Sequence, residues 1–451
     1  MNPISALRKK YDRFRVGQSP QRNLFYGFLS YIAIGTLLLC LPWLQKTSAP
    51  FIDHLFIATS AVSTTGLVTI SVFDSYNFFG QFIVMALFQL GGIGYLTFTT
   101  FMLLSTTRKI TRWHKRLLSS EFTLPVTIKI KDFLKSVILF TTIMEVIGAI
   151  LFFIAFKLDG MPNGEAVWNA IFHSISAFCT AGFSLFNTGF TGYVDNTFIN
   201  AIISFLAIAG SLGFIVVTDF VLMLRKKEHQ ISFTTRIILI GFAILLTFGF
   251  CFFYFFEPTI SSLSGKERIL ASFFQAMTAM TTVGFNTVDF GAFLLPMLLV
   301  TIFLMYIGAS PSGTAGGMKI TTLTAVFAIM KSRLRGSEKI TFLGRSIPFE
   351  RLYIATSSFI FYTSIIFFGA FLLTFTENFP YEEIVFETAS ALGTVGLSTG
   401  LTGDLSTFGK SLVILLMFVG RLGVLTFGLA IWEKTNSPDG EPKAIRDDIA
   451  V

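Results

Sequence analysis

The chain has 451 residues, of which 53% are hydrophobic and only 13% are charged, and its mean hydropathy is +0.71. Soluble domains carry roughly 25% charged residues, so this composition excludes an ordinary soluble enzyme and a disordered scaffold. The three cysteines, Cys40, Cys179 and Cys251, lie in or beside apolar runs, so neither a disulfide framework nor a metal cluster is expected. The chain is therefore predicted to be a polytopic membrane protein. In such proteins an excess of Lys and Arg marks cytoplasmic segments, so the net charge of +8 does not indicate nucleic-acid binding.

Eight apolar runs are long enough to cross a bilayer, which takes about 20 residues. In chain order they are 24–44, 78–104, 133–156, 198–224, 236–256, 291–308, 352–376 and 409–432. Five segments contain 26 of the 34 lysines and arginines: 1–23, 105–131, 225–236, 331–351 and 434–451. Because cytoplasmic segments are rich in Lys and Arg, both termini are predicted to be cytoplasmic.

Four apolar segments on the opposite side are predicted to be re-entrant half-helices, each followed by a short polar turn. These half-helices are 50–62, 165–178, 267–280 and 380–391. Every turn contains Thr-x-Gly, and the glycines are separated by 116, 102 and 112 positions. The turn residues are Thr64, Thr65, Gly66, Thr180, Ala181, Gly182, Thr282, Val283, Gly284, Thr394, Val395 and Gly396. Repetition at a fixed place between spans indicates a repeated architecture.

The pattern predicts an all-α polytopic membrane protein with four helix–pore-helix–helix repeats around a central pore. This gives eight transmembrane helices and four re-entrant pore loops. The predicted parts are a basic cytoplasmic N-terminus at 1–23, repeat 1 at 24–104, repeat 2 at 133–224, repeat 3 at 236–330, repeat 4 at 352–432 and a cytoplasmic tail at 433–451.

Irregular backbone at membrane depth is tolerated only where it is buried in protein or lines a water-filled cavity. Four such turns around one axis supply carbonyl oxygens that can replace the water of a dehydrated cation. The half-helices end at the axis with carbonyls of partial negative charge, which favours a cation. The turns therefore predict a cation filter. Carboxylates on the same side, including Asp53, Glu257, Glu377 and Glu387, form either a solvated face or a vestibule that concentrates cations.

A second glycine follows each turn by 24 to 28 residues: Gly91, Gly210, Gly308 and Gly420. The first, second and fourth belong to Gly-x-x-Gly, and close helix packing explains them as well as a role in the pore does. The third copy departs from this pattern and breaks the helix. Its residues are Gly308, Ala309, Ser310, Pro311, Ser312, Gly313, Thr314, Ala315, Gly316 and Gly317.

The 308–318 loop is predicted to line the cavity beneath the filter and to gate it, with a plain helix break as the alternative. A phosphate-binding loop is disfavoured because no strand precedes it and the Gly-Lys-Ser/Thr ending is missing. Arg421, in the fourth inner helix, is predicted to face the cavity and to hydrogen-bond loop carbonyls near 310–316, as a gate partner or as a static strut. Lys319 is placed at the cytoplasmic end of the span. Glu145 is either a proton or sodium site or a paired carboxylate.

The four Thr-x-Gly turns in four such units on one chain resemble the Trk/Ktr/HKT superfamily of potassium transporters, over about residues 20–432. The compact chain is most similar to KtrB, the family of membrane subunits of bacterial Ktr systems. The resemblance implies one potassium filter to which each glycine contributes, and a gate at the 308–318 loop. It also implies that glycine in the first turn, here Gly66, goes with potassium preference, whereas serine there is associated with sodium transport.

The resemblance further implies a bacterial plasma-membrane protein that forms a homodimer on a cytosolic ring of KtrA-like nucleotide-binding subunits. No cofactor is expected beyond K⁺ as the transported ion and Na⁺ as a candidate activator. The basic loops at 105–131, 225–236 and 331–351 offer docking surfaces for that ring, and anionic membrane lipids explain the same charge equally well.

Two rival functions belong to different classes. An ion-coupled secondary transporter, driven by Na⁺ or H⁺, also uses repeats and broken helices, but typically as two inverted halves. A membrane-embedded enzyme requires a catalytic constellation, and the sequence shows no zinc motif, nucleophile elbow or catalytic dyad in a suitable context. His54, His114, His173 and His229 are scattered without ligand spacing.

Overall fold

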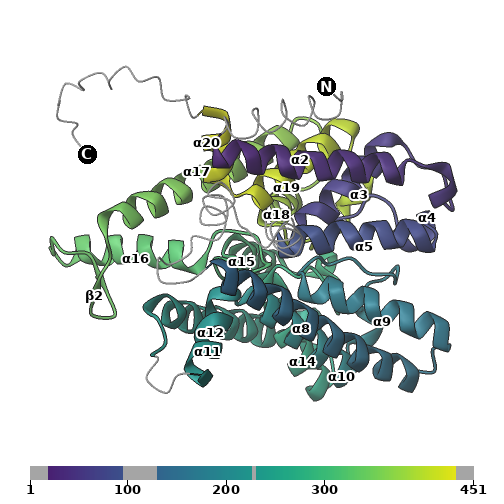
Figure 1. Cartoon of the computed structure of the whole chain (residues 1–451), viewed down its shortest axis with the longest axis horizontal. Helices are drawn as coiled ribbons and strands as arrows, with labels where there is room; N and C mark the ends of the chain where they lie inside the picture. Colours follow the sequence, from purple (N-terminus) through teal and green to yellow (C-terminus); the bar gives the residue numbers. More distant parts are fainter. Residues whose placement is uncertain (1–18, 95–129, 226–229, 433–451) are drawn as a thin grey trace, which may run out of the picture.

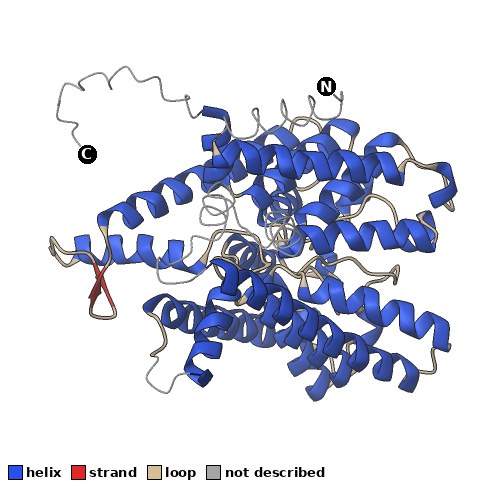
Figure 2. Cartoon of the chain, viewed as in Figure 1, coloured by secondary structure: helices blue, strands red, loops and turns tan. Residues whose placement is uncertain are grey.

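The computed structural model describes residues 19–94, 130–225 and 230–432 (Figure 1). Outside them lie most of the predicted N-terminal segment, residues 95–104 of repeat 1, most of the 105–131 loop, the 433–451 tail, His114 and His229. Within the described ranges the chain is almost entirely helical, and the only strands are the hairpin β1 (Thr341–Phe342) and β2 (Arg345–Ser346) (Figure 2).

The helices follow the predicted order of an outer helix, a pore helix and an inner helix in each repeat. The outer helices are α2 (Pro20–Leu39), α8 (Ile130–Leu158), α12 (Phe233–Phe256) and α17 (Phe349–Leu373). The pore helices are α3 (Phe51–Ser63), α9 (Asn163–Phe178), α14 (Gly265–Thr281) and α18 (Tyr381–Gly393). The inner helices begin as α5 (Phe78–Ile93), α10 (Thr197–Ser211), α15 (Leu295–Tyr306) and α19 (Thr407–Leu422). The fourfold repeat architecture is confirmed.

Short helical turns connect these elements outside the pore helices. They are η1 (Pro42–Leu44), α4 (Val72–Ser75), η2 (Thr191–Tyr193), α13 (Pro258–Ser261), η3 (Phe290–Ala292) and η4 (Leu401–Asp404). The four outer helices are long and apolar enough to span a membrane. Each exposes large apolar side chains, such as Leu37, Leu139, Ile244 and Phe367, as expected of surfaces that face lipid.

The inner helices are broken in more copies than the sequence predicted. The helix bends by 90° between α10 and α11 (Phe214–Arg225), and by 98° between α19 and α20 (Val424–Trp432). Gly213 and Gly423 at these bends have φ of +84° and +85°, a conformation that side-chain-bearing residues rarely adopt. Continuous spans at 198–224 and 409–432 are therefore replaced by bent pairs, because the second glycine of Gly-x-x-Gly ends the helix.

The repeats close into a ring, so the two ends of the described chain meet. In Figure 1, α2 and α20 lie side by side at the top. Arg22 Nε donates to Ala430 O at 3.0 Å across this contact. The third inner helix resumes after the 308–318 loop as α16 (Ile320–Leu334), and together with α17 and the β1–β2 hairpin it projects from one side of the molecule.

Candidate functional site: the four turns and the loop beneath them

All four turns share one backbone conformation. The threonine that ends each pore helix is left-handed, with φ of +53° at Thr64, +48° at Thr180, +57° at Thr282 and +48° at Thr394. The glycine two residues later also has positive φ, between +69° and +95°. A β-branched residue with positive φ is an outlier that persists only where the surrounding structure fixes it, and such outliers cluster at functional sites.

Hydrogen bonds to the last turn of each pore helix hold this conformation. The N–H of the residue after the threonine reaches the carbonyl five residues back, as from Thr65 to Ser60 and from Val395 to Ser390, both at 2.8 Å. This is the long bond of a Schellman cap, which satisfies carbonyls that the helix end leaves free. Here threonine occupies the position that glycine usually takes.

A hydroxyl on each pore helix supports the turn from behind, a feature that was not predicted from the sequence. Ser60 Oγ and Ser390 Oγ accept the N–H of Gly66 and of Gly396, both at 3.1 Å. In the other two repeats Ser176 Oγ donates to Phe183 O at 2.8 Å, and Thr278 Oγ1 donates to Phe285 O at 2.6 Å. The signal was present in the sequence, because every turn reads Ser/Thr-Ala-x-x-Thr-x-Gly.

The structure brings the four predicted glycines together in a closed ring. A Cβ atom added to Gly66 would lie 2.6 Å from Ala181 O and 3.0 Å from the Cα of Gly182. One added to Gly182 would lie 2.7 Å from Val283 O. The same close approach continues from Gly284 to Val395 O and from Gly396 back to Thr65 O. Each glycine thus abuts the middle carbonyl of the next turn, and side chains are excluded from the ring.

A pocket of about 210 Å³, the glycine pocket, is lined by Gly66, Gly182, Gly284 and Gly396 together. Its polar lining is neutral and comes from the segments after the turns: Ser71, Ser184, Asn187, Asn286 and Ser398. No described carboxylate lines it. A cation in this pocket would therefore meet amide and hydroxyl groups and not fixed negative charge.

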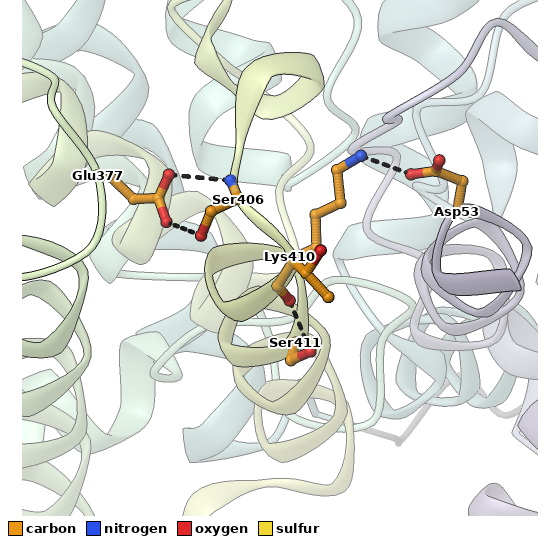
Figure 3. Close-up of polar contacts among 6 residues, drawn as sticks. Asp53, Glu377, Ser406, Lys410 and Ser411 are labelled. Carbon is orange, nitrogen blue, oxygen red and sulfur yellow. Dashed lines mark hydrogen bonds and ion pairs between the residues drawn. The ribbon is translucent and has the colours of Figure 1, made fainter. Parts of the chain in front are cut away.

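The carboxylates on this side of the molecule fasten helix ends to one another. Glu377 accepts Ser406 N at 3.0 Å and Ser406 Oγ at 2.5 Å, which joins the end of α17 to the start of α19 (Figure 3). Glu257 accepts Leu294 N at 3.2 Å in the same place of repeat 3. In repeat 2, Asp159 accepts a hydrogen bond from the Tyr193 hydroxyl at 3.0 Å. Burial is the main reason why the pKa of Tyr193 is raised to about 12, and this bond adds to the effect.

Asp53 forms an ion pair with Lys410 at 2.7 Å, between the first turn of α3 and α19 (Figure 3). Asp53, Glu257, Glu377 and Glu387 are each at most 8% exposed. For these four residues the solvated-face interpretation does not hold. Each of them has at least one carboxyl oxygen in an internal hydrogen bond or ion pair, which is how a buried carboxyl group is tolerated.

The 308–318 loop lies directly against the inner side of the turns. Gly316 N donates to Thr282 Oγ1 at 3.0 Å, and Thr180 Oγ1 lies 3.1 Å from Thr314 Oγ1. A Cβ atom added to Gly316 would collide with Thr394 Oγ1. The loop thus touches the threonines of three repeats. Backbone bonds from Thr314 N to Gly210 O and from Ile320 N to Ala309 O, both 3.1 Å, hold it in place.

Two cationic side chains hold the carbonyls of this loop. Arg421 Nη1 donates to Thr314 O at 2.7 Å, and its Nη2 donates to Gly91 O and to Gly92 O. Lys319 Nζ donates to Ala315 O at 2.6 Å and to Gly316 O at 2.8 Å. Three consecutive loop carbonyls therefore accept hydrogen bonds from these two side chains. Lys319 was predicted to be an end-of-span residue and not a pore group, but its side chain folds back onto the loop.

A cavity of about 780 Å³, the loop cavity, opens on the other side of the loop. Residues 311–313 and 315–319 of the loop line it, together with Arg421 and the helix-break residues Gly94 and Gly423. The glycine pocket, the turns, the loop and the loop cavity thus follow one another in that order. The loop separates the two spaces.

The inner-helix glycines provide close packing against the pore helices. A Cβ atom on Gly91, Gly210 or Gly420 would collide with Val62 O, Phe178 O or Leu392 O respectively. Each of these carbonyls lies two residues before the left-handed threonine. The packing interpretation therefore holds at these positions.

Glu145 is a partnered carboxylate, one of the two alternatives that the sequence left open. Gln89 Nε2 donates to its Oε2 at 2.9 Å, and Cys179 Sγ donates to Gln89 Oε1 at 3.1 Å. His54 and His173 are buried separately. The described residues contain no group of three or more His, Cys, Asp or Glu side chains that could hold a metal.

Comparison with known proteins agrees with this architecture. The family profile named TrkH, described as a cation transport protein, matches residues 20–439. The Ktr system potassium uptake protein B of Bacillus subtilis is 36% identical over 96% of this chain and 97% of its own length. The potassium/sodium uptake protein NtpJ of Enterococcus hirae is 33% identical over 99% of this chain and 100% of its own length.

The crystal structure of the potassium transporter TrkH from Vibrio parahaemolyticus shares the fold, with a TM-score of 0.74 and 19% identity. The match covers 92% of this chain and 85% of that one. The family consists of transport proteins and not enzymes. The chain is a multi-pass membrane protein, and it belongs to the TrkH family of cation transport proteins.

Proposed function

We propose that the chain takes up potassium across the bacterial plasma membrane, through a selectivity filter built from the four Thr-x-Gly turns. The closed ring of glycines is the observation that carries this proposal. The middle carbonyls of the turns, on Thr65, Ala181, Val283 and Val395, approach the ring from four sides. Neutral oxygens in such a ring can replace the hydration shell of K⁺ and still release the ion. Potassium in the names of both relatives supports this choice of ion.

The 308–318 loop is the gate in this proposal, and Arg421 is its partner. The loop lies between the glycine pocket and the loop cavity and contacts Thr180 and Thr282, so it blocks the path just inside the filter. The positive charge of Arg421 lies where a passing cation would have to go, and repulsion is strong where water is scarce. In this proposal, the described position of the loop is the closed one.

The substitution Gly66→Ser tests the filter. Gly66 has φ of +95°, and a side chain there would press on the carbonyl of Ala181, so the ring has to deform. We expect the preference for K⁺ over Na⁺ to fall, measured as uptake of both ions in cells that lack other potassium uptake. Gly164→Ser is the matched control, because a Cβ atom there meets nothing within 4 Å. Unchanged preference in Gly66→Ser excludes Gly66 from the filter.

An ion-coupled secondary transporter is the second candidate, supported by sodium in the name of the Enterococcus relative. Uptake in proteoliposomes with and without a sodium gradient separates the two functions. A fixed ratio of Na⁺ to K⁺ moved indicates coupling. Potassium flux without Na⁺ indicates a pore, in which Na⁺ would act only as an activator.

The assembly and orientation are also proposals. We propose a homodimer on a KtrA-like cytosolic ring, with both termini cytoplasmic. "Ktr system" in a relative's name supports a membrane component that works with other subunits. Arg335 and Arg345 between α16 and α17, and Arg351 in the first turn of α17, are exposed and suit docking to that ring or to anionic lipid headgroups. Binding of the purified chain to such a ring, compared with a variant that lacks these three charges, distinguishes the two partners.

A further inference from the structure

Each pore helix carries a fully buried side chain at the same position, seven residues before the left-handed threonine. These residues are Ile57, His173, Gln275 and Glu387, and all four are 0% exposed. Three of them are polar, which is costly at a buried site unless a hydrogen bond compensates. The hydrogen bonds of these three side chains therefore indicate the structural role of this position.

His173 connects the pore helix to the segment that follows Gly182. Its Nδ1 lies 2.8 Å from Asn169 O, and a carbonyl only accepts, so Nδ1 carries the proton. This leaves Nε2 as an acceptor. Leu185 N donates to Nε2 at 3.2 Å, and Ser184 Oγ lies 3.1 Å from it. The segment two to three residues beyond the glycine is thereby fastened to α9.

Gln275 and Glu387 make the equivalent connection in the next two repeats. Gln275 Nε2 donates to Val288 O at 2.7 Å, four residues after Gly284. Glu387 Oε1 accepts the Thr402 hydroxyl at 2.5 Å, and that hydroxyl also lies 2.9 Å from Ser398 Oγ, two residues after Gly396. The other carboxyl oxygen of Glu387 has no hydrogen-bond partner among the described residues, so this connection runs through Thr402.

Repeat 1 lacks the connection. Ile57 has no polar atom and packs within an apolar cluster with Ala58, Ala61 and Val62 of the same helix. In three repeats the segment after the turn glycine is thus fastened to its pore helix, by an imidazole, an amide and a carboxyl group. In repeat 1 it is not fastened at this position. This difference supplies an internal control.

We propose that His173, Gln275 and Glu387 are positioning residues that set the cation selectivity of the filter. The inference rests on the proposed filter. Carbonyl oxygens discriminate by ion size only if they cannot close around the smaller Na⁺ ion. His173, Gln275 and Glu387 hold the segments that follow the turn glycines, so they oppose this inward movement of the carbonyl oxygens. Because the three side chains are fully buried, the low dielectric around them strengthens these bonds, and little water is available to replace them.

The test measures the KM for K⁺ and the inhibition constant for Na⁺, with the full chain in cells that lack other potassium uptake. Thr402→Val removes the donor to Glu387 with little change of shape, and Gln275→Met removes the second brace at similar volume. Loss of one buried hydrogen bond is worth about 1 kcal/mol, so we expect the preference for K⁺ to fall about fivefold in each variant. The maximal rate should change less. Thr402→Ser restores the hydroxyl and should restore the preference.

Ile57→Met is the matched control at the unbraced position, and protein levels in the membrane are compared for every variant. Wild-type preference in both Thr402→Val and Gln275→Met, at wild-type protein levels, overturns the inference. An equal loss of preference in Ile57→Met also overturns it, because packing would then explain the effect. Absence of potassium uptake by the wild type defeats the proposed function itself, which is a separate outcome.

Discussion

At the scale of single residues, the site depends on threonines held in a conformation that suits glycine. The bonds from Thr65 N to Ser60 O and from Gly66 N to Ser60 Oγ show that one serine on the pore helix fixes both residues after Thr64. Ser390 does the same for Val395 and Gly396. The pore helices therefore shape the turns, and the strain is balanced by buried hydrogen bonds.

We predict that Ser390→Ala destabilises the protein by about 1–3 kcal/mol, because it leaves the N–H of Gly396 without its acceptor. The measurement is thermal unfolding of the purified protein in detergent. Ser364→Ala is the control, since the exposed Ser364 hydroxyl bonds only to its own helix, at Ile360 O. An equal effect of the two substitutions would mean that Ser390 does not support the turn.

The sequence predicted the turn residues well, because four copies in register make a weak motif specific. It did not predict the direction of Lys319, whose backbone precedes α16 while its side chain returns to Ala315 O and Gly316 O. That direction depends on how the loop packs under Thr282. No local pattern in the sequence contains this information.

At the scale of elements, hydropathy gave the outer helices but not the bends of the inner ones. The runs 198–224 and 409–432 are apolar throughout, so their composition fits a straight span. The bends of 90° and 98° require glycine with positive φ at positions 213 and 423, and a glycine alone does not say which φ it adopts. The break of the third copy was visible because Pro311 and four glycines occur together.

We predict that Arg421→Ala increases potassium flux through the unregulated chain. Its guanidinium joins Thr314 O of the loop to Gly91 O at the end of α5, so its removal frees the loop and takes away a repelling charge. A charged hydrogen bond is worth about 1.5–3 kcal/mol, which corresponds to a rise of about tenfold or more in the fraction of open molecules. Rubidium flux into proteoliposomes measures this.

Lys266→Ala, at an exposed position in the first turn of α14, is the control for the flux measurement. Flux and regulation of Arg421→Ala that match the wild type would leave Arg421 as a static strut. The flux of Arg421→Lys should lie between those of the wild type and Arg421→Ala, because a single ammonium group does not reproduce the forked donors of a guanidinium.

At the scale of the whole molecule, the ring must close between residues that are far apart in the sequence. The ion pair between Asp53 and Lys410 joins repeat 1 to repeat 4 across 357 positions (Figure 3). The contact of Gly396 with Thr65 O closes the same interface at the level of the turns. The sequence predicted four repeats around one axis, but it could not indicate which side chains join the first to the last.

We predict that Lys410→Met destabilises the protein by about 3–5 kcal/mol, because Asp53 is 4% exposed and would keep an uncompensated charge. The double variant Asp53→Leu with Lys410→Met should recover most of that loss. Thermal unfolding measures both, with the exposed Lys266→Met as control. A double variant less stable than the single one would show that the charges act independently.

The most direct measurement is an experimental structure of the protein in Rb⁺ or Tl⁺, with anomalous scattering to locate the ions. If the four turns form the filter, we expect anomalous density on the axis enclosed by Gly66, Gly182, Gly284 and Gly396. We also expect Gly66→Ser to weaken this density. Well-ordered turns with no ion between them, and ions bound elsewhere in the membrane region, would contradict it.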